Sequence, residues 1–250
     1  MKIDILASGS AGNCIAITHP NKKTILIDAG IAKTKIDKRL VEVGIHPINV
    51  AAIFITHSHG DHIKGLPLAN KYRIPVFAGE GEWKTISTVD LELQRPIKAR
   101  EKMNLESIGF YVESFGTHHD AMDPLGYTVH DYCGHKTSIC LDTGKVDQEM
   151  LEAMEYSSAY IIESNHEPNM VEAGDYPPSV KSRVLSDVGH LSNMQTAKAL
   201  FQLVNGVGEK IYLTHLSSKN NMPGLAEMTT KRALAKKGFK EGNHYFLEVC

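Results

Sequence analysis

The chain has 250 residues, of which 42% are hydrophobic and 22% are charged, a composition that supports a packed core and excludes an intrinsically disordered protein. The formal net charge is −2, so any contact with nucleic acid would need a local basic patch rather than an overall basic field. No apolar stretch approaches the ~20 residues that span a bilayer, and the N-terminal residues lack the apolar core of a signal peptide. We therefore expect a soluble cytoplasmic protein with no membrane partner.

The first half is expected to combine strands with a few helices. Apolar and β-branched runs bounded by turn residues predict strands at 2–7, 14–18, 24–30, 51–56 and 75–78. Apolar residues at helical spacing, such as Ile36, Leu40 and Val43 before Gly44, predict helices at 34–44, 63–72 and 82–89.

The second half opens with an expected strand at 109–115 and an expected hairpin, 126–132 with 136–142, that turns at Gly134. Helices and strands then alternate. Strands are expected at 159–164, 210–215 and 245–249, and helices at 147–156, 178–187, 193–204 and 224–238. This order, repeated roughly once in each half, predicts two mixed β-sheets with helices outside, a four-layer αββα sandwich. No linker or large insertion interrupts the pattern, so we expect a single domain over residues 1–250.

The four cysteines form no C-x-x-C pair, and their spacing indicates reduced thiols rather than a disulfide framework; they are Cys14, Cys133, Cys140 and Cys250. The 13 histidines, by contrast, cluster. The stretch "IFITHSHGDHIKG" places His57, His59, Asp61 and His62 directly after an apolar strand. Side chains at the carboxyl end of a buried strand face a crevice where α/β proteins place their sites. Imidazole and carboxylate are ligands for Zn²⁺ or Mn²⁺, so His57 and His59 could face one metal while Asp61 and His62 reach a second.

This stretch resembles the HxHxDH signature of the metallo-β-lactamase superfamily, and further elements follow in the expected order. "LIDAG" supplies Asp28, where the superfamily has an orienting carboxylate; "THHDA" supplies a histidine, "CLDTG" supplies Asp142 and "YLTHLS" supplies His215. The resemblance implies two divalent metal ions, Zn²⁺ or Mn²⁺, one bound by His57, His59 and a histidine of "THHDA", the other by Asp61, His62 and His215, with Asp142 as the bridge. "THHDA" offers His118 and His119; His119 is favoured because it precedes "DA" as in the nearest relatives, which leaves His118 as a supporting or surface residue.

Other stretches resemble one branch of the superfamily. "SGSAGNC", "IIESNHEPNM", "SDVGHLSNMQTA" and "THLSSKNN" are similar to the YycJ (WalJ) family, which is associated with 5′-to-3′ exonuclease activity on DNA. The resemblance implies that Glu163 and His190 supply protons, with His190 as the general acid for the leaving oxygen. Asp187 or Glu163 could hold the imidazolium, because a nearby carboxylate favours its charged form. We therefore expect a dinuclear metal-dependent phosphodiesterase with nucleic acid, DNA rather than RNA, as its substrate.

Two loops are candidates for holding a phosphate. Hydroxyls and backbone N–H groups at Ser8 and Ser10 suit an anion, although Asn13 could equally close its own turn. Lys219, Asn220 and Asn221 add a charge and amide donors directly after a candidate ligand. Two alternatives remain at this point: a glyoxalase II-like thioester or lactone hydrolase with the same metals, and a non-catalytic, metal-stabilised regulatory protein. The identity of the metal, the choice between DNA and RNA, the polarity and the oligomeric state are left open.

Overall fold

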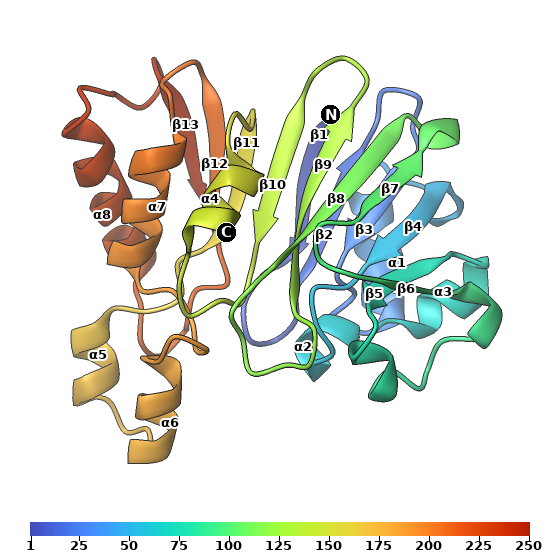
Figure 1. Cartoon of the computed structure of the whole chain (residues 1–250), viewed down its shortest axis with the longest axis horizontal. Helices are drawn as coiled ribbons and strands as arrows, with labels where there is room; N and C mark the ends of the chain where they lie inside the picture. Colours follow the sequence, from blue (N-terminus) through green and yellow to red (C-terminus); the bar gives the residue numbers. More distant parts are fainter. The chain divides into compact units, whose positions relative to one another are not determined.

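The computed structural model describes all 250 residues and divides the chain into two compact units (Figure 1). Unit 1 comprises Met1–Gly116 and Ala121–Gly134, and unit 2 comprises Thr117–Asp120 and His135–Cys250. Two such units can belong to one domain, so the expectation of a single domain over residues 1–250 stays a prediction. None of the helices combines the length and the hydrophobicity that crossing a membrane requires.

Unit 1 is built on a six-stranded mixed sheet whose spatial order follows the sequence. Its strands are β1 (Lys2–Ala7), β2 (Cys14–Thr18), β3 (Thr24–Ile27), β4 (Val50–Phe54), β5 (Val76–Gly79) and β6 (Gln94–Ile97). β1 to β3 pair antiparallel, and β3 to β6 pair parallel. Three further antiparallel strands are β7 (Lys102–Leu105), β8 (Phe110–Gly116) and β9 (Leu125–Asp131).

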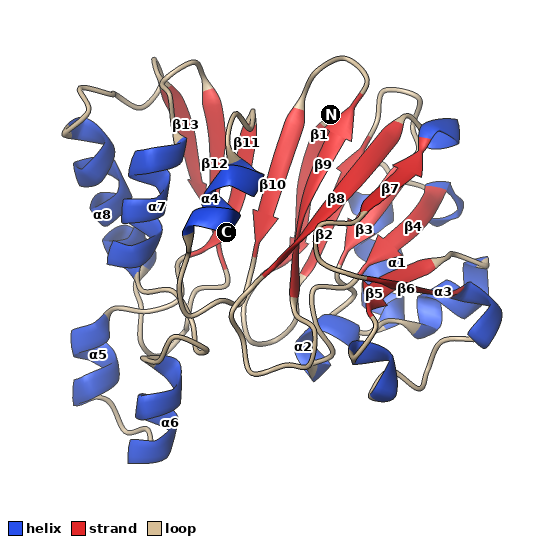
Figure 2. Ribbon diagram, viewed as in Figure 1, coloured by secondary structure: helices blue, strands red, loops and turns tan.

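The helices of unit 1 are short and connect these strands (Figure 2). The α-helices are α1 (Lys33–Glu42), α2 (Gly60–Ile63) and α3 (Pro67–Tyr72). Single 3₁₀ turns are η1 (Pro47–Asn49), η2 (Glu82–Lys84), η3 (Leu91–Leu93) and η4 (Glu106–Ile108).

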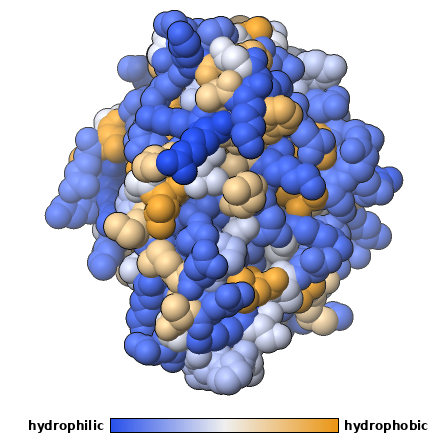
Figure 3. Space-filling model, turned by 90° about the vertical axis from the view of Figure 1, so that its left-hand side faces the viewer, coloured by the Kyte–Doolittle hydropathy of each residue, from blue (hydrophilic) through white to orange (hydrophobic).

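Unit 2 contains four parallel strands in the order β13-β12-β11-β10. They are β10 (Lys136–Cys140), β11 (Ala159–Glu163), β12 (Glu209–Thr214) and β13 (Tyr245–Val249). The helices are α4 (Gln148–Met154), α5 (Pro168–Ala173), α6 (Pro178–Val184), α7 (Asn193–Leu203) and α8 (Pro223–Ala235). α7 packs against both α4 and α8. Figure 3 shows the face formed by helices α5 to α8, where apolar side chains are scattered among hydrophilic ones, as is normal for a protein surface.

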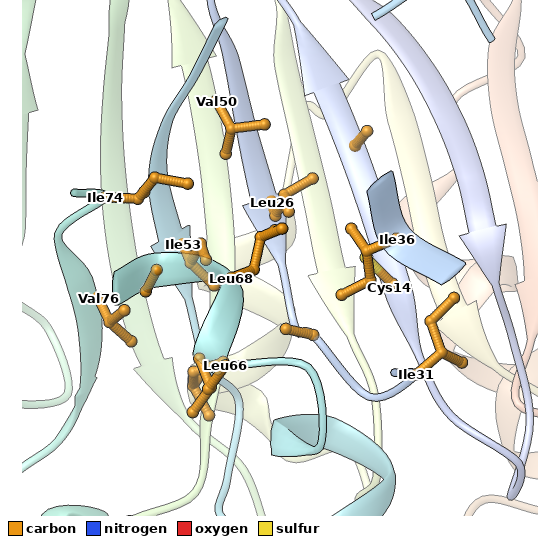
Figure 4. Close-up of a cluster of buried hydrophobic side chains, with 14 of the residues drawn as sticks. Cys14, Leu26, Ile31, Ile36, Val50, Ile53, Leu66, Leu68, Ile74 and Val76 are labelled. Atoms are coloured by element: carbon orange, nitrogen blue, oxygen red, sulfur yellow. The ribbon is translucent and has the colours of Figure 1, made fainter. Parts of the chain in front are cut away.

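A buried cluster in unit 1 fixes the strands that lead to the candidate site (Figure 4). Ile36 of α1 and Leu68 of α3 lie against Leu26 of β3 and Ile53 of β4, and all four side chains are fully buried. Burial of a side chain of this size contributes about 1.5–3 kcal/mol. Because β3 and β4 are parallel, their carboxyl ends meet at one edge of the sheet.

Most of the predicted elements are present, but one predicted helix is wrong. Residues 82–89 form only the single turn η2, because the carboxylate of Glu82 is buried and bonded to the backbone N–H groups of Ser58 and Asp123. The expected helix at 63–72 is instead two short helices, the second of which begins at Pro67. The strands β6 and β7 and the helix α5 were not expected, because their polar sequences carry no clear period.

Candidate metal centre

The HxHxDH stretch forms a compact histidine cluster in unit 1. β4 ends at Phe54, and the chain reaches α2 through residues 55–59. His57 Nε2 lies 2.9 Å from His59 Nδ1, and the rings of His57 and His62 are 4.1 Å apart. Asp61 Oδ2 lies 3.7 Å from His62 Nε2. The four candidate ligands of this stretch are therefore brought together by one turn and the start of one helix.

Asp28 contacts one of these histidines. Asp28 Oδ2 lies 2.7 Å from His62 Nδ1. Thr56 donates to Oδ1 of Asp28 from its backbone N–H (2.8 Å) and to Oδ2 from its hydroxyl (2.9 Å). Asp28 follows β3 with a left-handed φ of 60°, a backbone conformation that a non-glycine residue adopts rarely and that occurs at functional sites. With Nδ1 bonded to a carboxylate, His62 keeps Nε2 for a metal, the usual carboxylate–histidine–metal pattern.

The loop with Ser8, Ser10 and Asn13 lies against this cluster. The side chain of Asn13 accepts from Gly9 N (3.0 Å), and its amide nitrogen lies 3.1 Å from His62 Nε2. The alternative interpretation of Asn13 as a residue that closes its own turn is therefore what the structure shows. Ser10 is exposed and Ser8 is half-buried, so the two hydroxyls stay candidates for binding a phosphate.

Glu82 is a residue of this cluster that the sequence did not single out. Its carboxylate is fully buried and accepts from Ser58 N (2.8 Å) and from Asp123 N (2.7 Å). It thereby holds the backbone between His57 and His59 in place. No motif marks a glutamate that acts only through tertiary hydrogen bonds.

Unit 2 carries a second cluster, at the carboxyl ends of three adjacent parallel strands. One ligand atom from each of four residues lies within 4.8 Å of the others; the residues are Asp142, Glu163, His190 and His215. His190 Nδ1 lies 3.1 Å from Glu163 Oε2 and 3.6 Å from Asp142 Oδ1, and His215 Nδ1 contacts Asp142 Oδ1. Asp142 (φ 44°) and His215 (φ 54°) are left-handed, as Asp28 is in unit 1.

The charges in this cluster hold a proton on His190. Burial lowers the pKa of His190, but the charge of Glu163 and the hydrogen bonds from His190 to Asp142 and Glu163 outweigh burial and raise that pKa to about 9. Burial raises the pKa of Glu163, whereas His190 and His215 lower it, and the net direction is downward. His190 is thus an imidazolium at neutral pH when the cluster holds no cation, and it faces Glu163 through Nδ1.

The two histidines of "THHDA" have different surroundings. His119 is buried, its Nδ1 donates to the carbonyl of Gly189 (3.0 Å), and its ring lies 5.1 Å from the ring of His190. His118 instead bonds through Nε2 to Asp147 Oδ2 (2.6 Å), and Asp147 caps the N-terminus of α4. These contacts favour His119 as the ligand and give His118 a supporting role at a helix end.

Two candidate residues remain, Asp187 and Lys219. Asp187 pairs with Lys145 (3.0 Å) rather than with His190, so Glu163 is the carboxylate that holds the imidazolium. Lys219 is exposed, which leaves it able to contact a phosphate.

Asn220 and Asn221 are buried, and their contact with substrate stays a prediction. The amide of Asn221 donates to Ser164 O (2.7 Å) and exchanges bonds of 2.9 Å with Asn193. This network joins the loop after His215 to β11 and to α7. Asn165, whose amide donates to His215 O (2.8 Å), is another organising residue that the sequence did not reveal.

The donor atoms fit divalent metal ions. His62 and His119 each commit Nδ1 to a carboxylate or a carbonyl oxygen, which fixes the tautomer that presents Nε2 to a metal. The other donors are further imidazoles and the carboxylates of Asp61 and Asp142, which suit Zn²⁺ and Mn²⁺.

Comparisons with known proteins agree with this geometry. Residues 7–144 match the model of the metallo-beta-lactamase superfamily. Among solved structures, the metallo-beta-lactamase fold protein YhfI from Bacillus subtilis superimposes with a TM-score of 0.72 at 12% identity and covers 99% of this chain and 95% of its own. The fold and the histidine–carboxylate clusters thus define a member of the metallo-β-lactamase superfamily.

Two curated relatives narrow the assignment. The chain is 36% identical to exodeoxyribonuclease YycJ of Bacillus anthracis, over 98% of this chain and 93% of the relative. It is 38% identical to exodeoxyribonuclease WalJ of Streptococcus pneumoniae, over 94% and 88%. The chain belongs to the YycJ/WalJ family. The predicted fold class, the α/β metallo-β-lactamase fold with two mixed β-sheets, is confirmed.

Proposed function

We propose that the protein is a metal-dependent phosphodiesterase that removes nucleotides from DNA, with 5′-to-3′ polarity. The observation that carries the proposal is the His190–Glu163 pair, 3.1 Å apart in the same cluster as Asp142 and His215. A proton donor beside metal ligands suits a reaction whose leaving group is an alkoxide. The relatives named as exodeoxyribonucleases make DNA the substrate to test first.

The proposed metal centre takes two divalent ions, Zn²⁺ or Mn²⁺. Its ligands would be His57, His59, Asp61, His62, His119, Asp142 and His215. Such ions stabilise charge on a phosphoryl group and activate water for in-line attack. The protein's own part is to orient the ligands, through Asp28, Glu82 and the carbonyl of Gly189.

Proton transfer to the leaving group falls to His190. Glu163 occupies Nδ1 of the imidazole, so Nε2 is the ring atom that can donate to the leaving oxygen. Thr143 N donates to the second oxygen of Glu163 (2.6 Å), which holds the carboxylate against the ring. A positioned acid contributes roughly 10²–10⁴-fold to the rate. Ser8, Ser10 and Lys219 are proposed to contact the substrate phosphates.

A substrate panel tests the assignment. Protein reconstituted with Zn²⁺ or Mn²⁺ is offered 5′-phosphorylated DNA, RNA of the same sequence, a nitrophenyl phosphodiester and a glutathione thioester. We expect DNA to be hydrolysed with release of mononucleotides from the 5′ end, and the thioester to be a poor substrate. Dominant thioester turnover under every metal would instead assign the chain to the glyoxalase II-like hydrolases, and inactivity on the whole panel would favour a regulatory protein.

A further inference from the structure

A pocket of about 210 Å³ lies in unit 2, apart from the residues assigned to the metal centre. It opens between the segment that precedes and begins α4 and one side of α7. Its lining consists of Lys145, Val146, Leu151, Gln195, Lys198, Ala199 and Gln202.

The lining is cationic and amidic, with no carboxylate. Lys198 lies on α7 and is exposed to solvent. Lys145 pairs with Asp187 at 3.0 Å, but the Asp187 side chain is 75% exposed, and such a pair contributes little to stability. Both ammonium groups can therefore turn to an anionic ligand. Leu151 and Ala199 are largely buried and give the pocket an apolar floor.

The amide of Gln195 supports the wall of the pocket. Its oxygen accepts from Ser192 N (2.8 Å), and its nitrogen donates to Gly144 O (3.0 Å). The polar groups that face a ligand are thus Lys198, Gln202 and Lys145, whose pair with Asp187 is exposed. Two ammonium groups and a carboxamide over an apolar floor match the chemistry of a phosphate carried on a sugar.

The pocket is connected to the catalytic cluster through Thr143. The backbone N–H of Thr143 donates to Glu163 Oε1 (2.6 Å), and its hydroxyl donates to Lys145 O (2.8 Å). Lys145 follows Asp142 by three residues, so their Cα atoms are at most about 11 Å apart. A nucleic-acid strand advances about 3.4 Å per nucleotide in a duplex, so that span corresponds to about three nucleotides.

We propose that this pocket binds a backbone phosphate of the DNA substrate, one to three nucleotides from the bond that is cleaved. The inference rests on the proposed function, because it takes the substrate to be a polynucleotide rather than a small diester. Binding here would let a chain with a net charge of −2 hold DNA through a local cationic site.

The test is the salt dependence of DNA binding. A 5′-phosphorylated single-stranded oligonucleotide with a 3′ fluorophore is titrated with metal-loaded His190→Ala protein, and anisotropy gives Kd at 50 and 200 mM NaCl. Each lost phosphate contact on a single strand lowers the steepness of log Kd against log salt by about 0.7. Lys198→Ala should bind DNA more weakly than its parent at 50 mM salt. Between 50 and 200 mM salt, the Kd of the parent should rise by a factor about three times larger than that of Lys198→Ala. Lys198→Arg should retain binding.

Lys210→Ala is the matched control. Lys210 is an exposed lysine near the amino end of β12, so its removal changes the net charge equally but lies away from the carboxyl ends of the strands. Its Kd and salt slope should match the parent. In the otherwise native enzyme, Lys198→Ala should leave hydrolysis of a nitrophenyl phosphodiester unchanged. Equal effects of Lys198→Ala and Lys210→Ala, or a parallel loss on the nitrophenyl substrate, would overturn the proposal.

Measurements of DNA hydrolysis, DNA binding and nucleotide binding separate this proposal from the proposed function. If the native enzyme hydrolyses DNA but Lys198→Ala binds DNA as its parent does, the pocket assignment alone fails. If DNA binding depends on Lys198 but DNA is never hydrolysed, the pocket assignment stands and the exonuclease assignment fails. Binding of thymidine 5′-monophosphate that depends on Lys198 while DNA binding does not would make the pocket a free-nucleotide site and contradict the proposal.

Discussion

The pairing of His190 with Glu163 determines what the candidate site can do at the scale of single residues. A histidine with a pKa raised to about 9 keeps its proton at neutral pH, which a general acid requires. Asp142 also faces this ring, at 3.6 Å. The pair is therefore a proton donor held beside proposed metal ligands.

Glu163→Gln should lower the pKa of His190 in metal-free protein, because the substitution removes the largest contribution that raises it. The usual pKa of histidine is about 6.5, so the pair stabilises the folded state fully below pH 6.5 and loses that contribution as the pH rises through 9. The contribution is at most about 3 kcal/mol. NMR titration of the imidazole and urea unfolding at pH 6 and pH 9.5 measure both effects. An unchanged pKa in Glu163→Gln would remove Glu163 from the pair.

His190→Ala should distinguish substrates by their leaving groups. We expect DNA hydrolysis to fall by roughly 10²–10⁴-fold, while a nitrophenyl diester suffers much less because a phenolate leaves without a proton. Metal content and folding should stay near those of the parent. Equal losses on both substrates at saturation would favour a positioning role, and loss of bound metal would make His190 a ligand.

Asp28→Asn should weaken metal binding rather than abolish folding. The amide keeps the shape of the carboxylate but no longer holds His62 in the tautomer that presents Nε2. Loss of such a supporting carboxylate lowers metal affinity by roughly 10–100-fold. Competition with a chromophoric chelator measures the change, and Asp187→Asn, at an exposed carboxylate, is the control. Equal affinities for the two variants would contradict the orienting role.

At the scale of elements, strand ends and close backbone contacts aim the site residues. Asp28, Asp142 and His215 each follow a strand in a left-handed conformation, which turns the side chain away from the sheet. In unit 1 the loop after β3 is pressed against the HxHxDH stretch. A Cβ on Gly30 would lie 1.6 Å from Asp61 O and 2.5 Å from Asn13 N.

Gly30→Ala should therefore destabilise the protein by more than about 3 kcal/mol, because backbone atoms would have to move. Gly60→Ala is the comparison: it lies in the same region, and a Cβ there meets nothing within 4 Å. It should change the free energy of unfolding by less than about 1 kcal/mol. Denaturant unfolding of metal-free protein measures both values, and similar stabilities would contradict the close contact.

The sequence predicted the helices and strands whose apolar residues repeat with a clear period. It also pointed to candidate site residues that directly follow such strands. HxHxDH stands out because it comes directly after an apolar strand, whereas Asp28, Asp142 and His215 were proposed from the resemblance to the superfamily. Glu82, Asn165 and the Asn193–Asn221 bonds could not be found, since they join segments far apart in the chain. The sequence favoured His119 over His118, and the structure adds a physical difference, because Gly189 O lies beside the ring of His119 and Asp147 beside that of His118.

At the scale of the whole molecule, the candidate ligands come from both compact units. His57, His59, Asp61 and His62 belong to unit 1, whereas His119, Asp142 and His215 belong to unit 2. Each unit has its own histidine–carboxylate cluster, and removal of a ligand from either cluster should impair the same activity. That shared dependence is the central claim.

The most direct test measures metal content and DNA hydrolysis together in the wild type, His57→Ala and His215→Ala. The account predicts two metal ions per chain and release of mononucleotides from 5′-phosphorylated DNA by the wild type. It predicts a lower metal content and a loss of activity of at least about 10²-fold in each variant. Wild-type protein that binds two ions but leaves DNA intact would contradict the account, and so would a His57→Ala or His215→Ala variant that keeps its activity.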